Sequence, residues 1–454
     1  MTNYLAKRIA EYVSLIDYNK LSQEAIEESK KRLIDSIAVA LSAYNEEPIK
    51  IIFNVIKSST QRNGATLWGT KKKAPIDYAS FYNSTMTRYI DYNDTYLSKE
   101  ALHPSDSIGG LFSIVESMNL SGKDLILSII ISYEVACRLA DAASIRDRGW
   151  DHASYIGIGV AAGASKLLNI DTEKTIQAIN LTASNVITLR QVRVGELSMW
   201  KGCSAPNATR NAVFYTLLAA NGMTGPSPVF EGERGFFKQV SGEFSIDHFA
   251  GIETKDFKIL ETSIKYNPVE YHSMSAAEIA LRLYDKIKDY SKIKSIDVDT
   301  FNVAYQIIVK DPEKWDPKTK ETADHSMPYI IAHILVNGKI TKESYYLQAL
   351  KDERVKNLMK KINIKVDSEI DKLYPQGVPT RITVTLEDGS KISEEIIYPK
   401  GHYRNPLNRE EINNKFLSLT EPLLKDRAKE LLNKLWELDK VSNLKEIVEL
   451  MRIK

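Results

Sequence analysis

Cysteine is scarce in this chain, which contains only Cys137 and Cys203 among 454 residues. An iron–sulfur cluster is held by more thiolates than these two residues supply, so the chain cannot build one alone. The sequence also lacks any HxxxH or CxxC pair, and such pairs are typical of zinc sites. We therefore predict no metal site and no cofactor.

The chain also lacks an excess of charge of one sign and any long hydrophobic run. Its formal net charge is +2, and no Lys/Arg run is interleaved with aromatic residues, so nothing favours nucleic acid as a partner. The most apolar stretch, residues 125–131, is far shorter than the roughly 20 residues that a bilayer span requires. The beginning of the chain has no apolar signal core. We expect no nucleic-acid partner, no membrane partner and a cytoplasmic location.

What the chain does contain is helical periodicity through its first half. Apolar residues recur at helical spacing over 5–16 and 26–41. Residues 123–143 and 156–168 are apolar on too many faces for surface helices, so we predict that they pack centrally. The glycines of the latter stretch follow no strand-like run, which favours close helix packing over a dinucleotide-binding loop.

The pattern changes after about Lys265, where partial alternation of apolar and polar residues indicates strands. The clearest strands are residues 381–386 and 391–398, which flank the turn residues Asp388 and Gly389 and predict a β-hairpin. The tail is helical again. We therefore predict a mainly α fold, with a large all-helical domain and a smaller α+β domain inserted before the C-terminal helices.

A lysine at an expected helix start is the most informative feature of the sequence. Lys201 stands between Trp200 and small residues at the apparent beginning of a helix, and a Gly/Pro-rich loop follows at 221–237. The free N–H groups of a helix N-terminus bind anions, and a lysine there adds a full positive charge. This arrangement suits a carboxylate ligand, although an isolated lysine is more often simply solvated.

Two polar islands contain histidines. His103 follows Asp91, Asp94 and Thr95, and carboxylates near a histidine can hold it in one tautomer for proton transfer. From these residues alone, a surface histidine in an Asx-type turn is the commoner explanation. His152 precedes the second apolar stretch, and a helix-capping role explains it equally well. The histidines outside the polar islands are interpreted as structural.

Two further islands lie in the region of mixed helices and strands. Lys265 and His272 stand at the predicted junction between domains, where ligand clefts commonly form. Asp324, His325 and Tyr329 form the other island, and a helix cap ahead of a proline is its structural alternative.

Taken together, these islands resemble the 2-methylcitrate dehydratase branch of the MmgE/PrpD family. The resemblance runs from about Asp91 to Gly338, and the block at 195–237 carries most of it. It implies an active site in which some residues transfer protons and others bind the substrate. The implied catalytic residues are His103, His152 and Tyr329, and the implied substrate-binding residues are Asp91, Thr95, Lys201, Lys265, His272 and His325.

The resemblance also implies an architecture. The helices of 403–454 return to the large domain of residues 1–264, while residues 265–402 form the smaller domain. A homodimer is implied as well, and the apolar stretches of the first half are consistent with one, because they offer more surface to bury than one monomer easily needs. We predict that the site residues share a cleft between the two domains.

For function, the resemblance implies metal-independent removal of water from a small tricarboxylate, 2-methylcitrate, giving 2-methyl-cis-aconitate in the methylcitrate cycle of propionate catabolism. Citrate and cis-aconitate are further candidate substrates. General acids and bases must then abstract a proton and protonate the departing hydroxyl, while cations hold the carboxylates. Enzymes of two other kinds have a similar scaffold, cis-aconitate decarboxylase and iminodisuccinate epimerase. An inactive helical interaction protein is the alternative outside enzymes.

Overall fold

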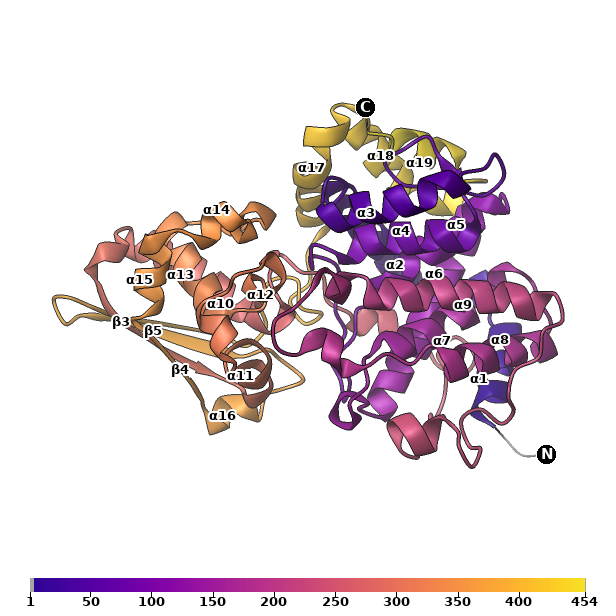
Figure 1. The fold of residues 1–454 in the computed structure, drawn as a ribbon, viewed down its shortest axis with the longest axis horizontal. Coiled ribbons are helices and arrows are strands. Elements are labelled where there is room, and N and C mark those ends of the chain that lie inside the picture. The colour runs from indigo at the N-terminus through magenta and orange to yellow at the C-terminus, as the bar shows by residue number, and fades with distance from the viewer. Residues whose placement is uncertain (1–3, 454) are drawn as a thin grey trace. The chain divides into compact units, whose positions relative to one another are not determined.

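The computed structural model describes residues 4–453, which are mainly helical, as predicted. They divide into two compact units (Figure 1). The first unit comprises the chain up to Val192 together with Gly202–Thr262 and the C-terminal residues from Asn408. The second comprises Arg193–Lys201 and Ser263–Leu407. Each unit is described below by itself.

The first unit is built almost entirely of helices. Its main helices are α1 (Leu5–Leu15), α2 (Gln23–Ser42), α3 (Glu47–Ile56), α4 (Ile76–Arg88), α5 (Ile108–Ser117), α6 (Gly122–Ala142), α7 (Ala153–Leu167), α8 (Thr172–Asn185), α9 (Ser204–Ala220), α17 (Arg409–Leu424), α18 (Arg427–Trp436) and α19 (Lys445–Leu450). The N-terminal α2 packs against the C-terminal α17, so residues from both ends of the chain share one unit.

Helices α6 and α7 form the centre of this unit, as the apolar stretches at 123–143 and 156–168 predicted. Both are buried along almost their whole length, and they pack closely against each other. A Cβ added at Gly159 would lie 2.5 Å from the Ser132 carbonyl oxygen on α6, and one at Gly163 would lie 2.7 Å from the Ser128 carbonyl oxygen. The two glycines therefore serve helix packing, since no other residue type leaves room for the neighbouring backbone.

The first unit is not all-helical, which corrects the sequence prediction in one detail. A two-stranded antiparallel ribbon joins β1 (Ala65–Thr66) to β2 (Lys73–Ala74). Each strand has two residues, which is too short for alternation of apolar and polar side chains to become visible in a sequence.

The second unit contains a four-stranded sheet in the order β4-β3-β5-β6. Strand β3 (Ile293–Thr300) pairs in parallel with β4 (Ile362–Val366) and antiparallel with β5 (Thr380–Leu386). The predicted hairpin is confirmed, because β5 pairs with β6 (Lys391–Ile396) through a turn in which Gly389 has a φ of 85°. Only glycine adopts that conformation without strain.

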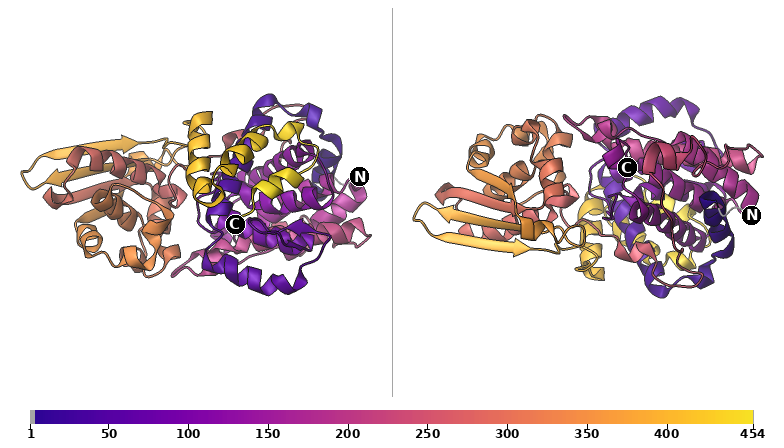
Figure 2. Two further views of the ribbon diagram at one scale, coloured as in Figure 1. Left: turned by 90° about the horizontal axis from the view of Figure 1, so that it is seen from above. Right: turned by 90° about the horizontal axis from the view of Figure 1, so that it is seen from below.

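Helices form a layer on this sheet (Figure 2). Helix α10 (Met274–Ile287) contacts β5 and β6, and α13 (Met327–Asn337) packs on α10. The shorter helices of the unit are α11 (Asn302–Ile308), α12 (Lys320–Ala323), α14 (Leu347–Leu350), α15 (Glu353–Met359) and α16 (Ser368–Asp371). None of the helices within residues 4–453 combines the length and apolarity that crossing a bilayer requires.

Candidate active site

The first group of predicted site residues occupies the loop between α4 and α5. Asp91 has a left-handed backbone, with a φ of 52°, shortly after α4 ends. Its carboxylate forms a buried ion pair with Arg88, and the carboxylate of Asp106 lies 3.7 Å from the same guanidinium. Removing one partner of such a pair leaves an uncompensated buried charge, so the three groups depend on one another.

His103 lies in the same loop, directly before a 3-10 turn at Pro104–Ser107. Its Nδ1 is 2.7 Å from the backbone carbonyl oxygen of Asp94 and 3.1 Å from Oγ1 of Thr95. Because a carbonyl oxygen can only accept a hydrogen bond, Nδ1 carries the hydrogen and donates it. Nε2 is then the basic nitrogen of His103 and can accept a proton from a ligand.

The carboxylate of Asp94 holds this loop in place. It accepts hydrogen bonds from the Ser105 N–H at 3.0 Å and the Tyr133 hydroxyl at 2.8 Å, and Arg32 Nε lies 3.9 Å away. Burial raises the pKa of the Asp94 carboxyl, while Arg32 and the hydrogen bonds oppose that rise. Asp94 thereby ties the backbone on both sides of His103 to the helical core.

His152 immediately precedes α7 and is buried. Its Nδ1 lies 3.7 Å from Oδ2 of Asp151, whose own N–H donates to the Thr188 carbonyl oxygen at 2.8 Å. The rings of His152 and His103 meet edge to face, with centroids 5.6 Å apart and planes at 68°. The structure therefore brings together two imidazoles, the side chain best suited to accept and return protons near neutral pH.

The second group of predicted residues lies in the unit that contains the sheet. Lys201 and Lys265 are 1% and 0% exposed. Lys201 Nζ is 3.7 Å from Oδ1 of Asp324, and that carboxylate also contacts His325 Nδ1. The Glu270 N–H donates to the Asp324 carbonyl oxygen at 3.0 Å, which connects the segment after Lys265 to this cluster.

His272 is paired with a carboxylate that the sequence interpretation did not count as a site residue. Its Nδ1 is 2.7 Å from Oε1 of Glu270, and its Nε2 is 3.4 Å from the Tyr374 hydroxyl. Burial alone would raise the pKa of Glu270, but the charges of His272, His325 and Lys265 and the hydrogen bond from His272 lower it to about 2. Glu270 is therefore ionised and serves as the counter-charge of its cationic neighbours.

Tyr329 is placed differently from the rest of its island. Its hydroxyl donates to the Ser344 carbonyl oxygen at 2.6 Å and lies 3.4 Å from His333 Nδ1. Burial raises the pKa of Tyr329, with a further contribution from Asp352. Its N–H donates to Oγ of Ser326, the N-cap of α13, so the helix-cap alternative holds for this part of the motif.

Two of the remaining histidines show the signs of structural residues. Burial lowers the pKa of both His333 and His402 to about 4, which leaves both imidazoles neutral at physiological pH. Sequence reasoning missed several residues that support the site, namely Arg32, Tyr133 and Glu270. Each is a buried polar residue within an otherwise ordinary helix or turn, and only the fold reveals what it contacts.

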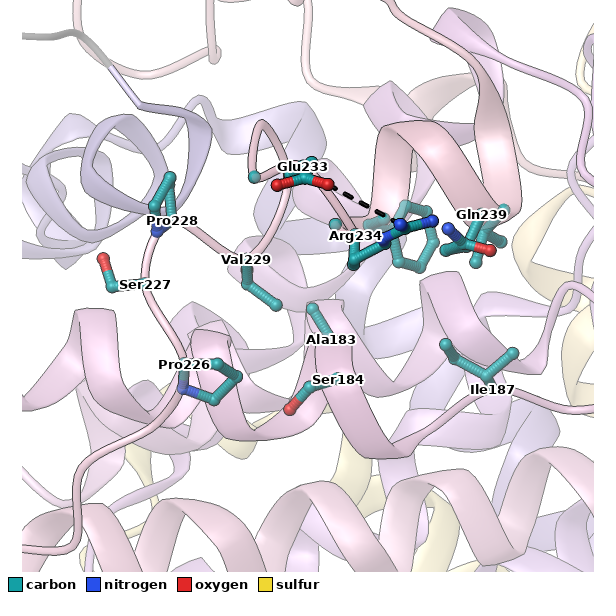
Figure 3. Close-up of a pocket in the computed structure, with 14 residues that line it drawn as sticks. Ala183, Ser184, Ile187, Pro226, Ser227, Pro228, Val229, Glu233, Arg234 and Gln239 are labelled. Atoms are coloured by element: carbon teal, nitrogen blue, oxygen red, sulfur yellow. Dashed lines mark ion pairs between the residues drawn. The ribbon is translucent and has the colours of Figure 1, made fainter.

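A separate cavity of about 400 Å³ lies in the first unit, between the end of α8 and the Gly/Pro-rich loop (Figure 3). None of the predicted site residues lines it. Glu233 and Arg234 at its rim pair at 3.6 Å, and the Gln239 carbonyl oxygen accepts the indole N–H of Trp150 at 3.0 Å. The short helix that follows this loop, Phe237–Ser241, thus packs against the turn that precedes His152.

Comparison with known proteins decides the family. The MmgE/PrpD N-terminal domain matches residues 7–248, and the MmgE/PrpD C-terminal domain matches residues 267–438. The chain belongs to the MmgE/PrpD family.

Individual relatives of this MmgE/PrpD chain bear two different names. The mitochondrial 2-methylcitrate dehydratase of Yarrowia lipolytica is 27% identical over 426 residues, covering 88% of this chain and 80% of the relative. The 2-methylcitrate dehydratase of Salmonella typhi is 27% identical and covers 87% of this chain and 85% of the relative. The cis-aconitate decarboxylase of Mus musculus is 23% identical over 477 residues, covering 100% of this chain and 94% of the relative.

Proposed function

We propose that this chain is a metal-independent 2-methylcitrate dehydratase, which eliminates water from 2-methylcitrate to give 2-methyl-cis-aconitate. Its relatives named 2-methylcitrate dehydratase support the reaction class. The observation that carries the proposal is the pair of adjacent imidazoles, His103 and His152, with the tautomer of His103 set by a backbone carbonyl.

In this proposal, the two histidines move the protons of the elimination. A base takes the proton from the carbon next to a carboxylate, the electron pair forms the double bond, and the hydroxyl leaves as water after an acid protonates it. Nε2 of His103 and the imidazole of His152 are the proposed proton carriers. Tyr329 is retained as a third candidate proton donor, but its hydroxyl must first break its hydrogen bond to the Ser344 carbonyl oxygen.

The remaining predicted residues are proposed to hold the substrate. Lys201 and Lys265 are proposed to bind carboxylates, because a buried ammonium interacts strongly with an anion where water is excluded. Asp91 and Thr95 are proposed to orient the substrate hydroxyl. Because Nδ1 of His103 carries a hydrogen, it cannot accept one from Thr95, so the hydroxyl hydrogen of Thr95 can be donated to a ligand.

His272 and His325 are proposed substrate ligands as well. Each imidazole already contacts a carboxylate, Glu270 for His272 and Asp324 for His325. Such a carboxylate orients the ring by accepting a hydrogen bond from Nδ1.

A decarboxylase is the second candidate, because the relative from Mus musculus covers the whole chain. An iminodisuccinate epimerase is a further alternative, and an inactive interaction protein is the alternative outside enzymes. A substrate panel separates the dehydratase from the decarboxylase. Purified protein is incubated with 2-methylcitrate, citrate and cis-aconitate, while the ultraviolet absorbance of the unsaturated product and release of carbon dioxide are followed.

The dehydratase proposal expects an unsaturated product from 2-methylcitrate and no carbon dioxide. A variant with both His103→Asn and His152→Asn serves as the control for contaminating activity. Carbon dioxide released from cis-aconitate would instead support the decarboxylase, and no product from any of the three acids would overturn both. Activity that survives a chelator supports the metal-independent mechanism, whereas loss with EDTA and recovery with iron would contradict it.

A further inference from the structure

A third lysine is buried in the second unit, and no role has been given to it so far. Lys314 lies in a 3-10 turn, Pro312–Trp315, and is 3% exposed. Its carbonyl oxygen accepts a hydrogen bond from Oγ of Ser326, the residue that caps α13. The turn is therefore held against the segment that contains Asp324 and His325.

The ammonium group of Lys314 differs from its backbone in having no direct partner. Within residues 4–453, the structure shows neither a hydrogen bond nor an ion pair of this group. Burial lowers the pKa of Lys314, and the charge of Lys201 lowers it further, while the charges of Asp324, Asp311 and Glu270 oppose this effect. The group therefore lies in the electrostatic neighbourhood of the Lys201–Asp324 pair.

Lys314 shares its unit with two other buried lysines, Lys201 and Lys265. Asp324 and Glu270, the buried carboxylates whose charges act on Lys314, already contact other side chains. An ammonium that is largely removed from water without gaining a counter-ion costs free energy. A ligand that carries negative charge would supply the missing partner.

We propose that Lys314 is a further substrate-binding residue, whose ammonium binds one carboxylate of a tricarboxylate ligand. The inference rests on the proposed function and deepens it. Together with Lys201 and Lys265, Lys314 gives the unit one buried ammonium for each of three carboxylates. Lys314 thus distinguishes a tricarboxylate from a dicarboxylate, because its ammonium, which has no direct partner among residues 4–453, gains one from the third carboxylate.

Binding of unreactive analogues to the full-length protein tests this directly. Tricarballylate has three carboxylates, glutarate lacks the central one and methylsuccinate lacks a terminal one. Isothermal titration calorimetry compares the wild type with Lys314→Met, which keeps the length and removes the charge, and with Lys314→Arg, which keeps the charge. Lys310→Met is the matched control, since Lys310 is an exposed lysine four residues earlier.

We expect Lys314→Met to bind tricarballylate roughly 10- to 100-fold more weakly, the loss typical of one charge-assisted hydrogen bond. The preference for tricarballylate over at least one of the two dicarboxylates should shrink correspondingly. Lys314→Arg should retain part of the affinity, and Lys310→Met should match the wild type. An unchanged affinity of Lys314→Met for tricarballylate, or no binding of tricarballylate by the wild type, would overturn the proposal.

Thermal unfolding without ligand separates a binding role from a structural one. If Lys314 awaits a ligand, Lys314→Met removes an uncompensated buried charge and should unfold at the same temperature as the wild type or a higher one. If Lys314 were a structural counter-charge of Asp324 or Glu270, the variant would unfold at a lower temperature, and the proposal would fail. Both tests measure the protein without catalysis. A loss of tricarballylate affinity in Lys314→Met would therefore support the binding role even if the substrate panel ruled out dehydration.

Discussion

Asp94 acts on His103 in two ways, through its side chain and through its backbone. Its carboxylate accepts hydrogen bonds from Ser105 and Tyr133, and its carbonyl oxygen accepts the hydrogen of His103 Nδ1. A side chain that positions the carboxylate therefore also positions the carbonyl that sets the tautomer. Tyr133, on α6, is such a residue, and it connects the imidazole to one of the two central helices of the unit.

Replacing Tyr133 with Phe should consequently lower turnover without much effect on substrate binding. The change deletes the 2.8 Å hydrogen bond to Asp94, a loss of about 1–2 kcal/mol in positioning, or roughly 10-fold in kcat with KM nearly unchanged. Steady-state kinetics measure both values. Tyr155→Phe is the matched control, because Tyr155 is also buried and its hydroxyl donates to the Ala143 carbonyl oxygen instead. If the two variants had equal turnover, Tyr133 would have no role in positioning His103.

The low pKa of Glu270 predicts how the folding stability of the protein depends on pH. Its folded pKa is about 2 against an ordinary value of 4.5, so the ionised form stabilises the folded state. This contribution is fully present above about pH 4.5 and is lost as the pH falls towards 2. Glu270→Gln should lower the free energy of unfolding at neutral pH by on the order of 3 kcal/mol. Urea unfolding from neutral to acid pH should show that difference shrink in acid, and a difference that grew would contradict the assignment.

Among individual residues, the sequence was informative where a motif was continuous and much less so where a residue stood alone. The resemblance to the MmgE/PrpD family singled out His103 and His152, and their rings meet in the structure. Lys314 and Tyr133 gave no signal, because a lysine in a turn and a tyrosine in a helix are normally unremarkable. Their importance arises from burial and from partners distant in the chain, which a single sequence does not display.

At the scale of elements, the packing of α7 on α6 depends on glycines, although glycine weakens an isolated helix. Gly159 and Gly163 face backbone carbonyls of α6, whereas a Cβ at Gly157 would meet the side chain of Val186, 2.8 Å away. A side chain can move aside, but the backbone of a central helix cannot do so easily. The three positions should therefore respond differently to the same change.

Gly159→Ala should destabilise the protein by roughly 1–3 kcal/mol, because the added methyl group forces α6 and α7 apart. Gly157→Ala should be close to neutral, since alanine favours the helix by about 1 kcal/mol and Val186 can adjust. Urea unfolding at neutral pH gives both values. Equal destabilisation by the two substitutions would show that the backbone contact does not decide the packing.

Elements with a strong repeating pattern were predictable, and very short ones were not. The hairpin of β5 and β6 and the central helices α6 and α7 were expected from alternation and from apolar composition. The ribbon of β1 and β2 was missed because each strand has two residues. The contact between Gln239, just after the Gly/Pro-rich loop, and Trp150 also could not be expected, since it joins residues far apart in the sequence.

At the scale of the whole molecule, both ends of the chain contribute to the first unit, and α2 packs against α17. The domain bounds expected from the sequence, 1–264 with 403–454 and 265–402, stay a prediction. Limited proteolysis that cuts first near residues 263–267 or 402–408 would support them. Early cuts within α10 or α17 would contradict them.

A homodimer is likewise a prediction at this scale. Large apolar side chains remain exposed on helices of the first unit, among them Val55 on α3 and Phe214 on α9, at 71% and 46%. Contact with a second copy would remove such surface from water. Multi-angle light scattering should therefore give twice the mass of the 51.3 kDa chain. A monomer at micromolar concentration would contradict the prediction.

Steady-state kinetics of His152→Ala with 2-methylcitrate test the central claim most directly, with Lys201→Ala as the comparison. If His152 carries a proton in the elimination, its variant should lose turnover by roughly 10²–10⁴-fold while remaining folded by circular dichroism. Lys201→Ala should mainly raise KM, because it removes a carboxylate partner but no proton carrier. Wild-type turnover by a folded His152→Ala protein would contradict the claim that this histidine pair performs the chemistry.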